Sequence, residues 1–414
     1  MDHAAVEASL ASIRLDIIGN DRQCDGIARL YLAAGEVPQF DIGTQDFTTD
    51  PNLVCASHYW RRRLLDEPTV AVVAECASWL AAHLTPEHRE TVCEQWSVEF
   101  ADSTKYLVQP MDGVVPFVAE LADGYLDRSG LQMICLYHAC KLRLNYRFEE
   151  LLTFLDAAPI AGIADFDDGS PVFTALRASG LLGSRTRHTG YALELVERVW
   201  TSSARTRASV DILTDGLDLA PPFDGHGELL RRYAAAAVAA YSGSHTFLYL
   251  LARGLYICGD YDDALHAIDE AVQRIPSSSD TSDYLRVMAR YRDLRHAIST
   301  SRDASAAFAA SEDRADKILS TVPERIEQVE HAAAVVDRHG TLSSSMTRIV
   351  LALALFGCAA AFMTASSNAQ TGHDLGLADR QWQVVVLGGS LAIFLVTLLG
   401  AAHFVRGLGR RKHR

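Results

Sequence analysis

Three residues of the kinds that bind zinc, Cys135, His138 and Cys140, lie within six positions of one another. On a helix, Cys135 and His138 would share a face, whereas Cys140 would point away from it. A structural zinc site also needs a second pair of ligands at suitable spacing, and the sequence offers none. We therefore expect these residues to be core thiols beside a histidine, with no metal and no other cofactor.

Two further motifs could do chemistry but lack residues that this chemistry needs. The aspartate-rich stretch 165–169 has its glycine one place too early for a calcium loop, and no glutamate follows at the required distance. His226 precedes a glycine, but a cysteine-protease dyad needs a strand-rich scaffold, so we expect a histidine in a loop. The sequence contains no phosphate-loop, dinucleotide-binding or zinc-protease motif. The sequence thus predicts no catalytic residue, and we do not expect an enzyme.

The charge is unevenly distributed along the 414 residues. The chain has 38 basic and 52 acidic residues; seven of the basic and two of the acidic ones follow position 345, which leaves residues 1–345 with a net charge of −19. A nucleic-acid-binding protein would present a basic face, so we expect no nucleic-acid partner. The acidic body favours a basic or neutral protein partner.

Helical periodicity recurs throughout residues 1–300, broken by short polar or Pro/Gly turns, and alternation with a period of two is almost absent. The sequence therefore predicts an all-α domain over 1–300. Its clearest unit spans residues 243–276, where a turn at 259–262 separates two amphipathic helices. Gly259 is free to take the left-handed conformation that ends a helix.

Small and large apolar residues alternate in this unit in a way that resembles the tetratricopeptide repeat. The residues that carry the resemblance are Leu248, Leu251, Ala252, Leu255, Gly259, Tyr261, Ala264, Ile268, Ala271 and Pro276. Leu248 stands where that family usually has Trp, Ala252 where it has Gly, and Leu255 where it has an aromatic residue. The resemblance implies two antiparallel helices that nest together and stack on neighbouring pairs into a solenoid.

Weaker copies of the unit are expected on both sides of it. One runs from Ala139 to Pro159, with Ala158 in place of Ala271 and Pro159 as its end. Another runs from Asn52 to Pro86, and helices at 229–241 and 283–298 would flank the best unit, the second as a cap.

Residues 301–345 are predicted to connect this domain to the rest of the chain. Thr321 and Glu324 form a candidate capping box, with Pro323 in the first turn of a new helix. Apolar residues then recur at steps of 4, 3, 4 and 3, as in a short coiled coil: Val322, Ile326, Val329, Ala333 and Val336. This stripe either packs back on the solenoid or joins copies of the chain. A flexible joint follows at 340–345.

Residues 346–414 are predicted to form two transmembrane helices, at 349–365 and 384–405. Both stretches lack charged side chains, and their helical lengths of roughly 26 and 33 Å bracket the ~30 Å hydrocarbon core. Basic residues flank the hairpin, which places both termini in the cytoplasm by the positive-inside rule. Small residues at Gly357, Ala361, Gly388 and Gly389 would allow close helix contact, either within the hairpin or between copies of the chain.

Together these features favour a scaffold anchored in a bacterial inner membrane, whose solenoid recruits a cytosolic protein or peptide. The alternative is a membrane-disrupting effector of a bacterial conflict (anti-phage) system, with the helical domain as its sensor. That alternative rests on the order of the segments alone. It would involve assembly of several copies of the chain.

Overall fold

The computed structural model describes residues 20–40, 50–165, 170–185, 188–275 and 281–337, together with a few single positions before residue 50. Every regular element in these ranges is an α-helix, which confirms the all-α prediction. None of the helices in this part of the chain is both long enough and apolar enough to cross a bilayer. The two expected spans, 349–365 and 384–405, lie outside the described residues.

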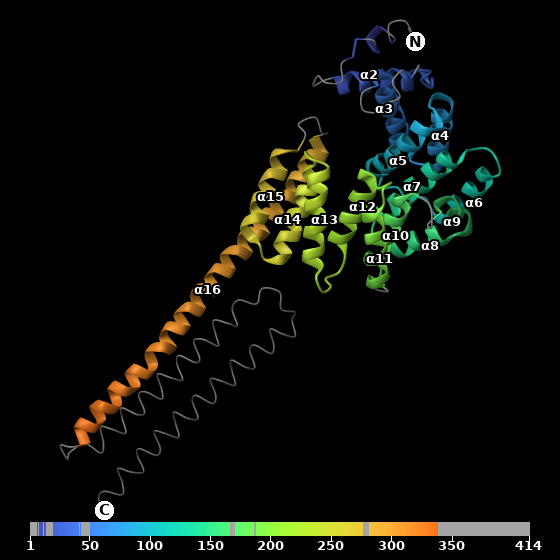
Figure 1. Cartoon of the computed structure of the whole chain (residues 1–414). Helices are drawn as coiled ribbons and strands as arrows, with labels where there is room; N and C mark the ends of the chain where they lie inside the picture. Colours follow the sequence, from blue (N-terminus) through green and yellow to red (C-terminus); the bar gives the residue numbers. More distant parts are fainter. Residues whose placement is uncertain are drawn as a thin grey trace, which may run out of the picture. The chain divides into compact units, whose positions relative to one another are not determined.

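The chain divides into two compact units, residues 1–299 and 300–414 (Figure 1). The helices of the first unit are α2 (Asn20–Ala34), α3 (Pro51–Asp66), α4 (Val70–His83), α5 (Pro86–Ser103), α6 (Met111–Ala122), α7 (Arg128–Leu144), α8 (Phe148–Asp156), α9 (Ala158–Ala164), α10 (Pro171–Gly183), α11 (Thr189–Thr201), α12 (Arg207–Leu219), α13 (His226–Ala240), α14 (His245–Cys258) and α15 (Tyr261–Gln273). The last helix, α16 (Thr281–Asp337), is continuous and contributes residues to both units.

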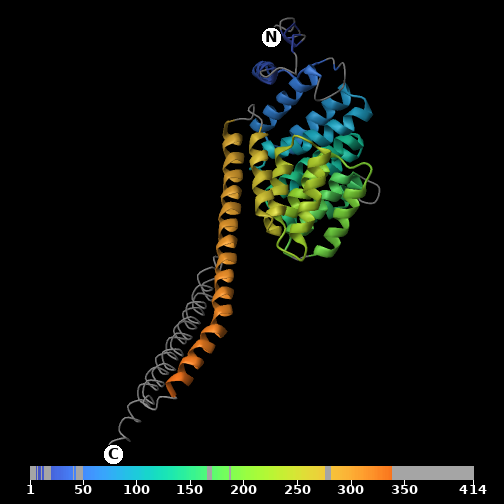
Figure 2. The same ribbon diagram turned by 60° about the vertical axis from the view of Figure 1, so that its left-hand side comes forward.

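Three consecutive helix pairs, α10/α11, α12/α13 and α14/α15, repeat one design. Their leading helices and then α16 begin at positions 171, 207, 245 and 281, at intervals of 36, 38 and 36 residues. A Ser or Thr precedes each leading helix of the pairs, namely Ser170, Thr206 and Ser244. The side chains of Ser170 and Thr206 accept hydrogen bonds from the backbone N–H groups of Val172 and Ser209, as helix N-caps do. Both views show these helices side by side (Figures 1 and 2).

A short motif, small residue–x–Gly–Leu, occupies the same place in each leading helix. It lies at Ala178–Leu181, Thr214–Leu217 and Ala252–Leu255. The small residue and the leucine are buried in all three cases. The glycine is the tenth residue of its helix each time, and it faces a neighbouring helix at close range. A Cβ atom on Gly216 would lie 2.9 Å from the Cβ of Ser179, and one on Gly254 would lie 2.5 Å from the backbone N of Arg231.

The second helix of each pair contributes a matching buried stripe at steps of four and three residues. The stripe consists of Ala192, Val196 and Val199 in α11, Leu230, Ala234 and Ala237 in α13, and Ala264, Ile268 and Ala271 in α15. Each of these side chains is at most 2% exposed. This spacing keeps one face of each of these helices towards the core.

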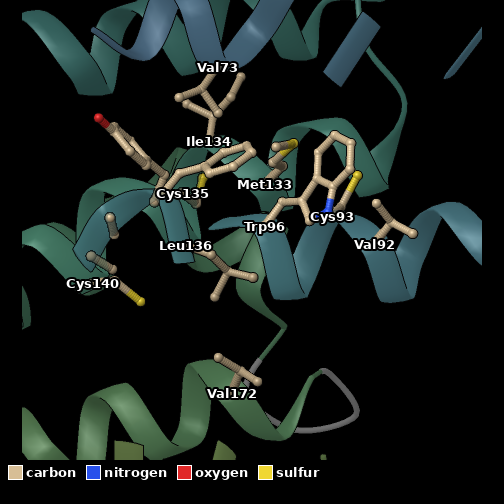
Figure 3. Packing of buried hydrophobic residues seen from close by; sticks show 14 of the residues in the cluster. Val73, Val92, Cys93, Trp96, Met133, Ile134, Cys135, Leu136, Cys140 and Val172 are labelled. Carbon is tan, nitrogen blue, oxygen red and sulfur yellow. The ribbon is translucent and has the colours of Figure 1, made fainter. Parts of the chain in front are cut away.

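The N-terminal half of the first unit is also built of helices in close contact, around a core shared by α4, α5, α7 and α10. Figure 3 shows the side chains of Cys93, Cys135 and Cys140 among apolar residues there. The expected pair at 52–86 corresponds to α3 and α4. The weaker copy at 139–159 corresponds to α7 and α8, but its predicted end is wrong. Ala158 and Pro159 open α9, because Pro fits the first turn of a helix, where its missing N–H costs nothing.

The predicted helix start at Thr321 is also wrong. Helix α16 runs through this position, and Pro323 lies in its interior. The Thr321 hydroxyl donates to the carbonyl of Ile318 within the helix instead of capping a new one. The surrounding residues are rich in Ala, Glu and Arg, which favour helix and offset the hydrogen bond that Pro323 removes. The expected cap at 283–298 is the first part of this same helix.

The close contact at Gly254 gives a stability prediction. We expect Gly254→Ala to destabilise the protein by about 2 kcal/mol, because the new methyl meets backbone atoms of Arg231 that cannot move aside. This loss exceeds the ~1 kcal/mol that Ala gains over Gly in a helix. Gly113→Ala in α6 is the control, since its Cβ would meet nothing within 4 Å. Chemical denaturation monitored by circular dichroism measures both, and equal stabilities of the two variants would contradict the packing.

Candidate functional site

An open groove of about 810 Å³ lies on the surface of α13, α14 and α15. Its lining consists of Gly225, Glu228, Leu229, Arg231, Arg232, Ala235, Val238, Leu248, Leu251, Leu255, Asp263, His266, Ala267 and Glu270. The groove therefore lies on the hairpin that resembles a tetratricopeptide unit, together with the helix that precedes it.

The floor of the groove is apolar and comes from all three helices. Leu248, Leu251 and Leu255 line it along one face of α14, and Ala267 of α15 adds to it. Leu251 is only partly buried, so it is available to a ligand, whereas Leu248 is held in the core. The close approach of α13 and α14 at Gly254 brings Leu229 and Val238 to the same floor.

Charged side chains form the rim, and most of them are in ion pairs, either with one another or with charged residues just outside the groove. Arg231 donates to Asp260 at 2.9 Å and to Glu228 at 2.6 Å, and the Glu228 carboxylate raises the pKa of this guanidinium. Arg232 donates to Glu197 of α11 at 3.1 Å, and Glu270 pairs with Arg274. Both arginines of the rim are thus engaged by carboxylates.

Asp263 is the exception on the rim. It is exposed, it lines the groove, and within the described part of the chain it forms no ion pair. Asp262 and Asp263 both lie in the first turn of α15, where the helix dipole favours a negative charge. Only Asp263 faces the groove, which leaves an unneutralised carboxylate beside its apolar floor.

The residues singled out in the sequence fall into three groups in this hairpin. Ala252, Ala264, Ile268 and Ala271 are fully buried between helices and are inaccessible to a ligand, whereas Leu248, Leu251 and Leu255 line the groove. Gly259 ends α14 with a φ of 86°, in the left-handed region, and the ring of Tyr261 lies 6.2 Å from that of Tyr256. Pro276 and the small residues Gly357, Ala361, Gly388 and Gly389 lie outside the described residues.

A second polar cluster joins α12, α14 and the start of α16. The Asp218 carboxylate, with its side chain 5% exposed, accepts from Arg253 at 2.7 Å and from Arg290 at 3.4 Å. The Arg290 guanidinium lies 4.3 Å from the centre of the Tyr249 ring, which stacks on Tyr291 at 4.9 Å. These contacts link the leading helices α12 and α14 to the first part of α16.

Two further aspartates of α12, Asp211 and Asp215, lie two turns and one turn before Asp218 on the same face. Asp215 pairs with Arg143 of α7. Burial and the neighbouring Asp215 carboxylate raise the pKa of Asp211 to about 6, although Arg143 acts in the opposite direction. The ionised form of Asp211 is therefore held at a cost to the folded state.

The residues that could have bound zinc are placed for packing. Cys135, His138 and Cys140 are all buried in α7, and His138 meets the edge of the Phe154 ring at 4.7 Å. Burial raises the pKa of the Cys140 thiol to about 12 and lowers that of His138 to about 4. Among the described residues no group of three His, Cys, Asp or Glu side chains could hold a metal ion.

The remaining two motifs are His226 and the aspartate-rich stretch 165–169. The prediction for His226 is wrong, and the second motif is described only in part. His226 is not a loop residue: it opens α13, stacks on Phe223, and its Nε2 lies 2.7 Å from the carbonyl oxygen of Leu217. Asp165 ends α9 and pairs with Arg128 at 2.9 Å. Residues 166–169 of the aspartate-rich stretch lie outside the described part.

The sequence analysis did not identify the charged residues of the groove rim, nor the two arginines, Arg253 and Arg290, that bind Asp218. Isolated Arg, Asp and Tyr residues on amphipathic helices give no signal of their own, because any solvated helix face carries them. The repeated small–x–Gly–Leu motif was visible at intervals of 36 and 38 residues, and it would have aligned α10, α12 and α14.

Comparison with known proteins adds no relative. The chain matches no protein-family model and no curated protein in sequence.

The raised pKa of Asp211 predicts a pH-dependent effect. Because the folded state binds this proton more tightly than the unfolded state, whose pKa is near 3.8, Asp211 lowers stability as the pH rises from about 4 to about 6. We expect Asp211→Asn to stabilise the protein at pH 8 by about 1 kcal/mol, less than the ~3 kcal/mol that a fully buried group would give.

That gain should shrink below pH 5, where Asp211 of the folded protein is protonated. Thermal unfolding at pH 4.5 and pH 8 measures the difference, with the exposed Asp224→Asn as control. An equal gain at both pH values would contradict the assignment.

Proposed function

We propose that this protein is a membrane-anchored scaffold related in design to tetratricopeptide proteins. Its groove on α13–α15 would capture an amphipathic helix, basic or neutral in charge, that belongs to a cytosolic protein. The observation that carries this proposal is an apolar floor exposed beside the unpaired carboxylate of Asp263.

Three features of the groove support a helical ligand. An amphipathic helix lays its apolar face into a groove and keeps its polar face in water. The floor contains three leucines along one face of α14 and an alanine of α15, and Leu251 is exposed enough to contact a ligand. The rim arginines are already paired, so the remaining charge at the groove is negative and favours Lys or Arg on the partner.

The repeated design supports the family resemblance. The regular intervals, the Ser or Thr before each leading helix and the small–x–Gly–Leu motif are what a solenoid of helix pairs requires. In this interpretation α10–α15 form three repeats and the first part of α16 covers the last of them, through Tyr291, Leu294 and Ile298.

The anchor is inferred from the sequence of residues 346–414. Two uncharged stretches of 17 and 22 residues, flanked by basic residues, would place the protein in the bacterial inner membrane with both termini in the cytoplasm. The groove would then face the cytosol and concentrate its partner at the membrane surface.

The groove is tested with a defined probe, a fluorescein-labelled amphipathic helix of Leu and Lys, added to the full chain in detergent. We expect binding, and we expect Asp263→Lys to weaken it by about tenfold, because a repulsive charge replaces the attractive one. Fluorescence anisotropy at low and moderate salt measures the dissociation constant, and the loss should be smaller at higher salt.

Asp262→Lys is the matched control. It makes the same change of charge in the same helix turn, but Asp262 does not line the groove. A peptide with Glu in place of Lys should bind more weakly to the native chain. Equal weakening by both variants, or equal binding of both peptides, would contradict docking in the groove.

The anchor is tested by deleting residues 346–414. The shortened chain should move from the membrane fraction to the soluble fraction and stay strongly helical, because both core clusters of the described residues end at or before Ile298. A shortened chain that still sediments with membranes would contradict the anchor.

The second candidate function, a membrane-disrupting effector, is favoured by one observation. Large apolar side chains of α16 are exposed at residues 318–326, which suits assembly of copies close to a membrane. Dye leakage from cells that express the full chain, and none from cells with the deletion, would favour the effector over the scaffold.

A further inference from the structure

Large apolar side chains are exposed on the second part of α16. Ile318, Leu319, Val322 and Ile326 are 59%, 66%, 40% and 48% exposed. The opposite face of the helix is polar, with Lys317, Ser320 and Glu324. A one-sided apolar stripe on a helix is stable in water only when something covers it.

The stripe continues a heptad pattern of apolar residues, here called the seam, that begins in the first part of α16. Tyr291, Leu294 and Ile298 recur at steps of three and four, and all are buried in the second core cluster. The same heptad register places Leu319 and Ile326 at a positions and Val322 at a d position. The sequence extends it with Ala333 at a and with Val329 and Val336 at d.

A long stretch of helix separates the stripe from the buried part of this pattern. It is continuous from Ile298 to Ile326, and 28 residues of helix extend over about 40 Å. The stripe therefore lies far along the helix from the buried side chain of Ile298.

The charges beside the seam are complementary to those of an identical helix. Arg325 is at a g position and Glu330 at the next e position, and both side chains are exposed. In a parallel coiled coil these two positions meet between chains, so every copy would give and receive one Arg325–Glu330 pair. In an antiparallel pair g would face g, and Arg325 would meet Arg325.

We propose that residues 315–337 of α16 join copies of this protein in a parallel coiled coil. Valine at three successive d positions, with Leu and Ile at a, favours three or four strands over two. Such a bundle brings the chain segments after residue 337 of all copies to the same end. It would also present several grooves together, which raises the apparent affinity for a partner with more than one binding segment.

The test uses the full chain purified in detergent. Sedimentation equilibrium should give the mass of three or four chains for the native protein. Ile326→Asp should reduce it to one chain over at least a hundredfold range of concentration, because it places a charge in the seam. Ser320→Asp, which adds the same charge on the polar face, should leave the assembly intact.

Cross-linking tests the register. Val322→Cys should form an interchain disulfide at least about tenfold faster than Lys317→Cys, since a d position brings identical residues together and the f position of Lys317 does not. The native cysteines are the same in both variants, so they contribute an equal background. A native mass of one or two chains, persistence of the assembly in Ile326→Asp, or equal cross-linking of the two cysteine variants would overturn the proposal.

The proposal does not depend on the docking groove. Ile326→Asp should still bind the Leu/Lys peptide with unchanged affinity, because the groove lies on α13–α15. Loss of assembly with binding retained, and loss of binding in Asp263→Lys with assembly retained, separate the failure of one proposal from the failure of the other.

Discussion

The contact between the backbones of α13 and α14, at Arg231 and Gly254, determines how the most regular part of the first unit is arranged. With no side chain at Gly254, the two helices approach more closely than any other residue would permit. The same motif brings Gly216 against Ser179, so α10 and α12 meet in a similar way.

The close approach of α13 and α14 also shapes the surface of the groove. It holds Arg231 at the rim, where Glu228 and Asp260 neutralise it, and it brings the apolar residues of α13 and α14 into one shallow floor.

The acidic composition of the body is balanced unequally in the structure. On α12 the carboxylates of Asp215 and Asp218 are matched by arginines from α7, α14 and α16, so these charges tie neighbouring helices together. Asp211 lacks such a full match, and its raised pKa records the cost. At the groove both arginines form ion pairs with carboxylates, whereas Asp263 forms none within the described residues. Compensated charges thus stabilise the stack, and the uncompensated one lies where a ligand could reach it.

The sequence predicts the parts of this fold that depend on local periodicity. The hairpin at 243–276 is one example, because Gly259 and the alternation of small and large residues specify a turn and two buried faces within a few residues. The errors arise where one residue has two structural uses. Pro159 ends a repeat in the sequence pattern but opens α9, and Pro323 suits a first turn but lies inside α16. The groove could not be predicted in this way, since Glu228, Leu251 and Asp263 meet only through the packing of three helices.

Helix α16 shows how one periodic pattern can serve two environments. Tyr291, Leu294 and Ile298 follow the same register as Leu319, Val322 and Ile326, yet the first three are buried and the last three are exposed. The residues between them explain the change. Ser301, Ser305 and Glu312 occupy seam positions where an apolar residue would be needed, so the apolar stripe is interrupted while the helix continues. An uninterrupted stripe would give a single interface over the whole helix. The interruption instead separates a part that is buried against the last helix pair from a part that is exposed, and the proposed coiled coil would cover this second part with an identical helix through the Arg325 and Glu330 positions.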